Sequence, residues 1–178
     1  NLNVERGLRE LAKAAPDSIK ISLSGFTPET YARTHARGEL NLVKSNMYLL
    51  RHYLDKYAAR TRVWVGHHLY RSNRDQVGAV KALCDELRFE HHPIAAFYQP
   101  LERLVDLLEG RWEGAPIMDD MVEHPLTYLP RIKAQRSGEH DCELRFNQTV
   151  INHDGTVALC CSVYDRSQML GVNFLERS

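Results

Sequence analysis

Strand-like and helix-like segments alternate through the first part of the 178-residue chain. Apolar residues recur at helical spacing in residues 4–15, and a short run rich in β-branched residues follows at 19–23. Further strands are predicted at residues 62–70 and 89–97, the second of which contains Pro93. Because strands that alternate with helices at this interval pair in parallel, the pattern predicts an α/β fold built on a parallel sheet.

The helices between these strands have recognisable ends. Thr27 and Pro28 are expected at the N-cap and the first position of a helix. Asn73 is expected to cap a later helix, and Pro100 to begin the last one of the series. Residues 111–139 lose the periodicity and contain several prolines, so we interpret them as a connector.

Three of the four cysteines lie in one short segment near the C-terminus, at Cys142, Cys160 and Cys161. Two strand-like runs flank Asp154-Gly155, a dipeptide typical of a hairpin turn. A hairpin bent there would bring Cys142 back toward the other two. Grouped in this way, the thiolates would be ligands of an iron–sulfur cluster or of zinc, or else ordinary buried thiols. The residues alone leave these three interpretations open.

The composition excludes some classes of partner and location for this protein. The chain has 23 basic and 23 acidic residues, which gives no electrostatic case for nucleic acid or a membrane as partner. No run approaches the roughly 20 apolar residues of a transmembrane helix. Four cysteines without regular spacing do not resemble a secreted disulfide framework, so we expect a reducing cytoplasm. Cys84 falls on the apolar stripe of a helix and is predicted to pack in the core.

Polar residues follow the predicted strands. On the first strand, Ser22 shares a face with Lys20 and Ser24, a polar set that suggests a face turned toward a ligand. The pairs His67-His68 and His91-His92 are interpreted mainly as solvated strand-end residues. Arg71 is a candidate for holding a carboxylate, and Asp119-Asp120 is interpreted as a solvated turn.

Two segments resemble radical SAM enzymes. The string IKISLSGFTPETYARTHARG, residues 19–38, is similar to the fourth strand and following helix of that family: an apolar strand, Ser, a small residue, Gly, and a helix with an Arg-Gly pair. Residues 40–53, LNLVKSNMYLLRHY, are similar to the family helix that carries Val-x-x-Asn. The resemblance implies that Ser22 or Ser24, beside Gly25, hydrogen-bonds the ribose of S-adenosylmethionine (SAM).

The C-terminal segment resembles the opening of the SPASM domain, an extension that binds auxiliary iron–sulfur clusters. Cys142, Gly155 and Cys160 have the family order and spacing, with twelve and then four residues between them. Residues 170–173, Leu-Gly-Val-Asn, resemble the Leu-Gly-Asn that follows in many such proteins. The resemblance implies Cys142 and Cys160 as ligands of a 4Fe-4S cluster, with Cys161 as a further candidate.

The resemblance also implies an architecture and an activity. Residues 1–113 would form the C-terminal half of a partial (β/α)6 TIM-like barrel, 114–139 a connector, and 140–178 the β-hairpin start of a SPASM or twitch domain. The parent enzyme would generate a 5′-deoxyadenosyl radical that modifies a peptide, a protein or a sugar-like small molecule. An electron donor such as flavodoxin or ferredoxin would supply the electron.

The defining feature of the family is among those missing from these residues. The Cys-x3-Cys-x2-Cys loop that holds the SAM-binding cluster does not occur in the sequence. We therefore expect an internal fragment of a larger enzyme. Two alternatives stay open: a non-catalytic metal- or peptide-binding α/β module, and a zinc site completed by His140 and His153.

Overall fold

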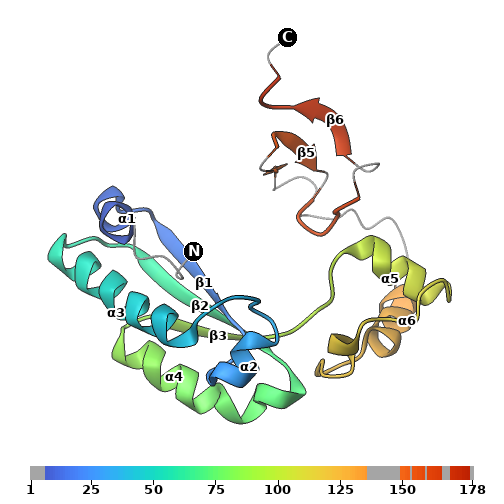
Figure 1. Cartoon of the computed structure of the whole chain (residues 1–178), viewed down its shortest axis with the longest axis horizontal. Helices are drawn as coiled ribbons and strands as arrows, with labels where there is room; N and C mark the ends of the chain where they lie inside the picture. The colour runs from blue at the N-terminus through green and yellow to red at the C-terminus, as the bar shows by residue number, and fades with distance from the viewer. Residues whose placement is uncertain (1–6, 136–148, 153, 159, 166–168, 177–178) are drawn as a thin grey trace. The chain divides into compact units, whose positions relative to one another are not determined.

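The computed structural model describes residues 7–135, 149–152, 154–158, 160–165 and 169–176. The chain divides into two compact units (Figure 1). The first comprises residues 1–96 with 120–122, and the second comprises residues 97–119 with 123–178. Each unit has a three-stranded sheet of its own.

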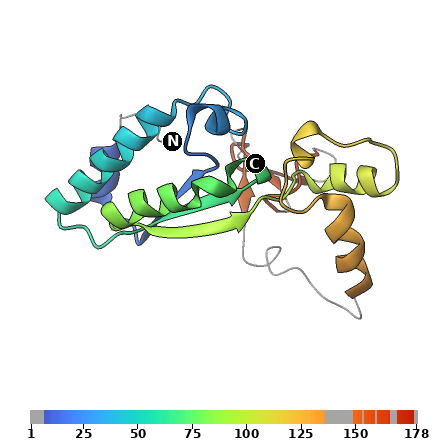
Figure 2. The same ribbon diagram turned by 90° about the horizontal axis from the view of Figure 1, so that it is seen from below.

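The first unit alternates strands and helices. Its elements are α1 (Leu8–Ala14), β1 (Ser18–Leu23), α2 (Pro28–Ala32), α3 (Leu40–Lys56), β2 (Arg62–Leu69), the 3-10 helix η1 (Arg71–Gln76), α4 (Val77–Glu86) and β3 (Glu90–Ala95). The three strands pair in parallel in the order β1-β2-β3. The predicted α/β class and parallel sheet are therefore confirmed. Figure 2 shows α3 and α4 together over one face of this sheet.

Strand periodicity explains why one face is covered. Ile21 on β1 and Val65 on β2 are buried and point toward the helices. The residues next to each of them in its own strand point the other way. The helical side of the core includes Met47 and Leu50 of α3, neither of which is exposed. Cys84 of α4 is also fully buried, as its place on the apolar stripe predicts.

The ends of the elements follow their local sequence in most cases. Thr27 forms a capping box with Thr30 and Pro28 begins α2, as predicted. Asn73, in contrast, does not cap α4, which begins at Val77. It lies inside η1, where its side chain fills a buried position between strand ends.

Pro93 lies inside β3 without breaking the strand. Among the strands that the structure describes, β3 is the last in the sheet order and pairs with β2 alone. A proline that cannot donate a backbone hydrogen bond is tolerated on such an edge strand.

The second unit combines helices with a small antiparallel sheet. Its elements are α5 (Leu101–Leu108), η2 (Pro116–Met118), α6 (Pro125–Gln135), β4 (Val150–Ile151), β5 (Thr156–Ala158) and β6 (Met169–Asn173). Pro100 precedes α5 as its N-cap, close to the predicted start. The segment interpreted as a connector contains α6, a helix that carries Pro130 in its interior. Interior prolines are rare in helices, which is why the sequence pattern missed this one.

The predicted hairpin around Asp154-Gly155 is present. Val150 pairs with Ala158 in an antiparallel register, and Gly155 in the turn has φ +82°. β6 adds to β5, with Thr156 opposite Asn173.

Candidate functional site

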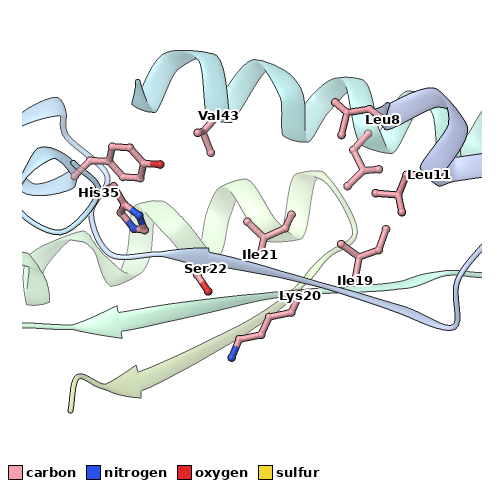
Figure 3. A pocket seen from close by; sticks show the side chains of 10 residues that line it. Leu8, Leu11, Ile19, Lys20, Ile21, Ser22, His35 and Val43 are labelled. Carbon is pink, nitrogen blue, oxygen red and sulfur yellow. The ribbon is translucent and has the colours of Figure 1, made fainter. Parts of the chain in front are cut away.

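The first candidate site is the face of the parallel sheet that the helices leave uncovered. Figure 3 shows Lys20 and Ser22 pointing away from α3, whereas Ile19 and Ile21 point toward the helices. The predicted sharing of a face by Lys20 and Ser22 is thus confirmed. Both side chains are exposed, so they are available to a ligand that approaches this face.

Ser22 and Ser24 have different surroundings. Ser24 is 5% exposed, and its hydroxyl lies 3.3 Å from Nδ1 of His68. Ser22 is exposed, with no hydrogen-bond partner for its hydroxyl among the residues that the structure describes. Of the two predicted cofactor-binding serines, Ser22 has the hydroxyl that is free to contact a ligand, whereas Ser24 orients the ring of His68.

Gly25 permits a tight connection between β1 and α2. A Cβ at this position would lie 2.5 Å from the backbone nitrogen of Tyr31 and 2.6 Å from Thr30 Oγ1. These distances are shorter than any van der Waals contact, so a larger residue would push α2 away from the end of the strand. The role visible in the structure is close backbone packing beside the two serines.

A buried amide fixes the carboxyl ends of β1 and β2 to each other. Asn73 is 1% exposed, and its Nδ2 donates to the carbonyl oxygens of Ser24 at 2.9 Å and His68 at 3.0 Å. Its Oδ1 accepts from the backbone N–H of Tyr70 at 2.8 Å. Because all three contacts are hydrogen bonds to backbone groups, the position of His68 is tightly constrained.

His67 and His68 of β2 are not simply solvated, which corrects the sequence interpretation for this pair. His67 is fully buried on the helix-covered face, and its Nδ1 lies 3.3 Å from Nε2 of His91. Burial, followed by the nearby His91 and His68, lowers the pKa of His67 to about 4. Burial first and Lys20 second lower the pKa of His68. Both rings are therefore neutral at physiological pH, which suits a proton acceptor at His68 and a packing role at His67.

A cavity of about 320 Å³ runs beside β1 (Figure 3). Apolar side chains of α1, β1 and α3 form most of its lining, with His35 at one end and Leu8 and Leu11 at the other. The ring of His35 stacks on Tyr31 with 4.3 Å between centroids. Burial, followed by the neighbouring His68, lowers the pKa of His35, so this end of the cavity is polar but uncharged.

Asp119 and Asp120 lie in a turn, as predicted, and Asp119 is exposed, but the carboxylate of Asp120 is not simply solvated. Its carboxylate accepts hydrogen bonds from the backbone N–H of Ser72 at 2.9 Å and from the Ser72 hydroxyl at 2.5 Å. Its carbonyl oxygen accepts from the backbone N–H of Arg71 at 2.7 Å. A single acidic residue thus fixes the start of η1, and with it the backbone of Arg71 beyond the end of β2.

The second candidate site is the cysteine segment of the second unit. Cys160 is half-buried and Cys161 is exposed, and both are free thiols. They follow β5 in a turn and are not part of the strand, so strand alternation does not force their side chains to opposite faces. The backbone N–H of Ser162 donates to Cys160 Sγ at 3.4 Å. This hydrogen bond fixes the position of the Cys160 sulfur in the turn.

The other predicted ligands of this site lie elsewhere. Cys142 lies outside the described residues, as do His140 and His153 of the zinc alternative. Within the described part of the chain, no group of three or more His, Cys, Asp or Glu side chains is placed to hold a metal ion. Cys160 and Cys161 are therefore the two predicted metal ligands whose positions the structure gives.

Gly155 and Asn173 come together although they are 18 positions apart in the sequence. The Asn173 Nδ2 donates to the carbonyl oxygen of Asp154 at 3.2 Å, and the backbone N–H of Phe174 donates to the carbonyl oxygen of Gly155 at 2.8 Å. A Cβ on Gly155 would lie only 2.2 Å from Asn173 Oδ1. Gly155 and Asn173 thus support one turn.

No family model matches this chain, and neither the curated proteins nor the solved structures gave a match. Among the described residues, no helix combines the length and the apolar character needed to cross a membrane.

Proposed function

We propose that this chain is part of a radical SAM enzyme with a SPASM-type auxiliary cluster segment. The observation that carries the proposal is the placement of Ser22 on the uncovered face of a parallel sheet, near the carboxyl end of β1 and beside the Ser24–His68 contact. Ligands of parallel α/β folds bind at these carboxyl ends. A hydroxyl donates and accepts, as a ribose diol requires.

The arrangement of the first unit fits a partial barrel. β1 is the first strand in the sheet order, so its outer edge is free among the described residues, and the 320 Å³ cavity runs along this side of the strand. In a (β/α)6 barrel, another βα unit would pair with that edge and fill the apolar space. The same closure would turn Lys20 and Ser22 toward the barrel interior, where the cofactor would bind.

The residues of this chain would have distinct roles. Ser22 would hydrogen-bond the SAM ribose, Ser24 and Asn73 would hold His68 in place, and Gly25 would let α2 pack against the strand end. A SAM bound there would supply, once an external electron had cleaved its C5′–S bond and released methionine, a 5′-deoxyadenosyl radical for removing hydrogen from a substrate. The chain's contribution is to bind and orient the cofactor and to exclude water.

Cys160 and Cys161, together with Cys142, would bind an auxiliary 4Fe-4S cluster, which takes four thiolate ligands as a rule. Flavodoxin or ferredoxin would supply the electron, and a peptide, a protein or a sugar-like molecule would be the substrate. The two free thiols fit the reducing cytoplasm expected from the sequence.

The cofactor part of the proposal is tested by measuring SAM binding calorimetrically. Ser22→Ala removes one hydroxyl, and we expect the Kd for SAM to rise about fivefold, as for the loss of a hydrogen bond worth about 1 kcal/mol. Ser18→Ala is the matched control, because Ser18 lies on the same face at the opposite end of β1. Equal affinity of the wild type and Ser22→Ala would refute the assignment.

The cluster part is tested by anaerobic reconstitution with iron and sulfide. We expect broad visible absorbance in the wild type and a large loss of bound iron in Cys160→Ser. Cys84→Ser is the control, because Cys84 is buried in the other unit. Protein that stays free of iron would favour the non-catalytic α/β binding module, and stoichiometric zinc would favour the zinc site.

A further inference from the structure

The free edge of β1 carries backbone groups that have no partner in the sheet. Among the described strands, β1 is the first in the sheet order and pairs with β2 alone. The backbone N–H of Arg62 donates to the carbonyl oxygen of Asp17, which sets the phase of the ladder. Backbone groups of successive strand residues point to opposite edges. Those of Ile21 therefore face β2, whereas those of Lys20 and Ser22 face the free edge.

The cavity of about 320 Å³ lies along these unpaired groups. Lys20 and Ser22 both line it, although their side chains point away from α3 (Figure 3). The backbone of β1 is therefore what these two residues contribute to the cavity wall. At one end, the buried Nε2 of His35 has no hydrogen-bond partner among the described residues. The cavity thus combines an apolar wall with a row of hydrogen-bonding groups.

These two kinds of wall determine what the cavity accepts. The apolar wall includes side chains of α1 and α3, among them Leu8, Leu11 and Val43. A purely apolar ligand would cover these side chains but would leave the backbone groups of the β1 edge without partners. An extended polypeptide satisfies both walls, because its backbone pairs with the edge while every second side chain enters the cavity.

The uncovered face of the sheet sets the charge of the remaining side chains. In an added strand, the residue beside Lys20 would point to the same face as Lys20. Lys20 forms no ion pair within the described part of the chain, and its Nζ lies 4.8 Å from the centroid of the Trp64 ring on β2. Opposite charges on neighbouring strands stabilise their pairing. We propose that the free edge of β1 binds a β-strand whose side chains alternate between apolar ones, toward the helices, and acidic ones, beside Lys20.

This inference rests on the proposed function for the source of the strand, which would be the adjoining βα unit of the barrel. The alternating pattern itself follows from the β1 edge, the cavity and Lys20. Its test needs neither SAM nor a cluster, so its failure would leave the Ser22 test of cofactor binding untouched.

A blocked peptide of sequence Val-Glu-Val-Glu-Val is a suitable stand-in for the strand, because its pattern is the same in both chain directions. The matched peptide Val-Gln-Val-Gln-Val keeps the shape and removes the charge. Amide hydrogen exchange of the full chain is followed by NMR with each peptide. In the free chain, we expect the amides of Lys20 and Ser22 to exchange faster than that of Ile21. Near saturation with the glutamate peptide, exchange at Lys20 and Ser22 should slow by about tenfold, as for a new backbone hydrogen bond.

Two pairs of variants separate shape from charge. Leu11→Trp places a large ring in the cavity and should raise the Kd of the glutamate peptide about tenfold, as for the lost burial of one valine side chain. Leu42→Trp is the matched control, because Leu11 and Leu42 are both 37% exposed and Leu42 lies outside the cavity lining. Wild type should bind the glutamate peptide about threefold more tightly than the glutamine peptide, as an exposed ion pair allows. Lys20→Met should abolish this preference, whereas Lys81→Met, a change at an exposed lysine of α4, should keep it.

Unchanged exchange at Lys20 and Ser22 near saturation would overturn the proposal, because the peptide would then bind without pairing with the edge. Equal effects of Leu11→Trp and Leu42→Trp would show that no side chain of the peptide enters the cavity, and would also overturn it. The same holds if wild type binds both peptides equally, or if the glutamate peptide does not bind at all.

Discussion

The buried His67, which contacts the half-buried His91, makes the stability of the first unit depend on pH. In the unfolded chain, His67 takes up a proton below its ordinary pKa of 6.5, whereas in the folded chain burial lowers the pKa to about 4. The folded state resists protonation of His67. The stability that the neutral ring contributes is therefore fully present above pH 6.5 and is lost as the pH falls toward 4. The whole shift corresponds to about 3 kcal/mol of unfolding free energy, of which about 2 kcal/mol is lost between about pH 7.5 and about pH 5.

The measurement is urea unfolding followed by circular dichroism at the two pH values. His67→Leu removes the titrating group while keeping an apolar side chain of similar size. Other histidines have lowered pKa values, His35 and His68 among them. They contribute equally to the pH dependence of unfolding in the wild type and in His67→Leu. The difference between wild type and variant therefore isolates His67 together with its coupling to His91, which also faces Lys81 and Asp85.

Between about pH 7.5 and about pH 5, we expect the unfolding free energy of His67→Leu to fall by about 2 kcal/mol less than that of the wild type. His52→Gln, a change at an exposed position of α3, should keep the wild-type profile. Parallel pH profiles for wild type and His67→Leu would refute the reasoning, because they would mean that His67 is protonated as readily in the folded chain as in the unfolded one.

Three further predictions concern positions described above. Gly155→Ala should lower the unfolding free energy of the second unit by about 2 kcal/mol, because φ is positive and the new methyl group would meet Asn173; unchanged urea unfolding would contradict this. Asp120→Ala should destabilise the first unit by about 1–3 kcal/mol, because the half-buried donors of Ser72 lose their acceptor; urea unfolding with an unchanged m-value checks it. Cys84 should resist iodoacetamide in the native protein at mildly alkaline pH, because burial raises its pKa to about 11; mass spectrometry showing native-state labelling of Cys84 would count against the buried position.

The elements with strong local signals were predictable from the sequence. The β-branched runs of β1 and β2, the Thr27-Pro28 start of α2 and the Asp154-Gly155 turn each depend on residues close together in the chain. Their local preferences agree with the final fold, which is the condition under which such predictions succeed.

The features that the sequence analysis did not predict share a different cause. α6 tolerates Pro130 in its interior, which no periodicity rule anticipates. Asp120 and Ser72 are 48 positions apart, so nothing local to Asp120 indicates that its carboxylate caps a 3-10 helix. His67 was placed near solvent because histidine is polar, whereas alternation along β2 puts it on the same face as Val63 and Val65. Applying strand alternation to β2 as strictly as to β1 would have placed it correctly.

Burial and hydrogen-bond saturation separate structural from ligand-facing groups at the carboxyl ends of β1 and β2. Asn73 uses both polar atoms of its side chain on backbone partners, and Ser24 is buried against His68. These groups are committed to holding the two strand ends together. Ser22 and Lys20 come from the same short strand, yet they are exposed, and neither has a hydrogen bond or an ion pair within the described chain. Water can hydrate both exposed groups, and a ligand can replace that water without breaking any contact inside the fold, so Ser22 and Lys20 are the groups of this strand that a ligand can reach.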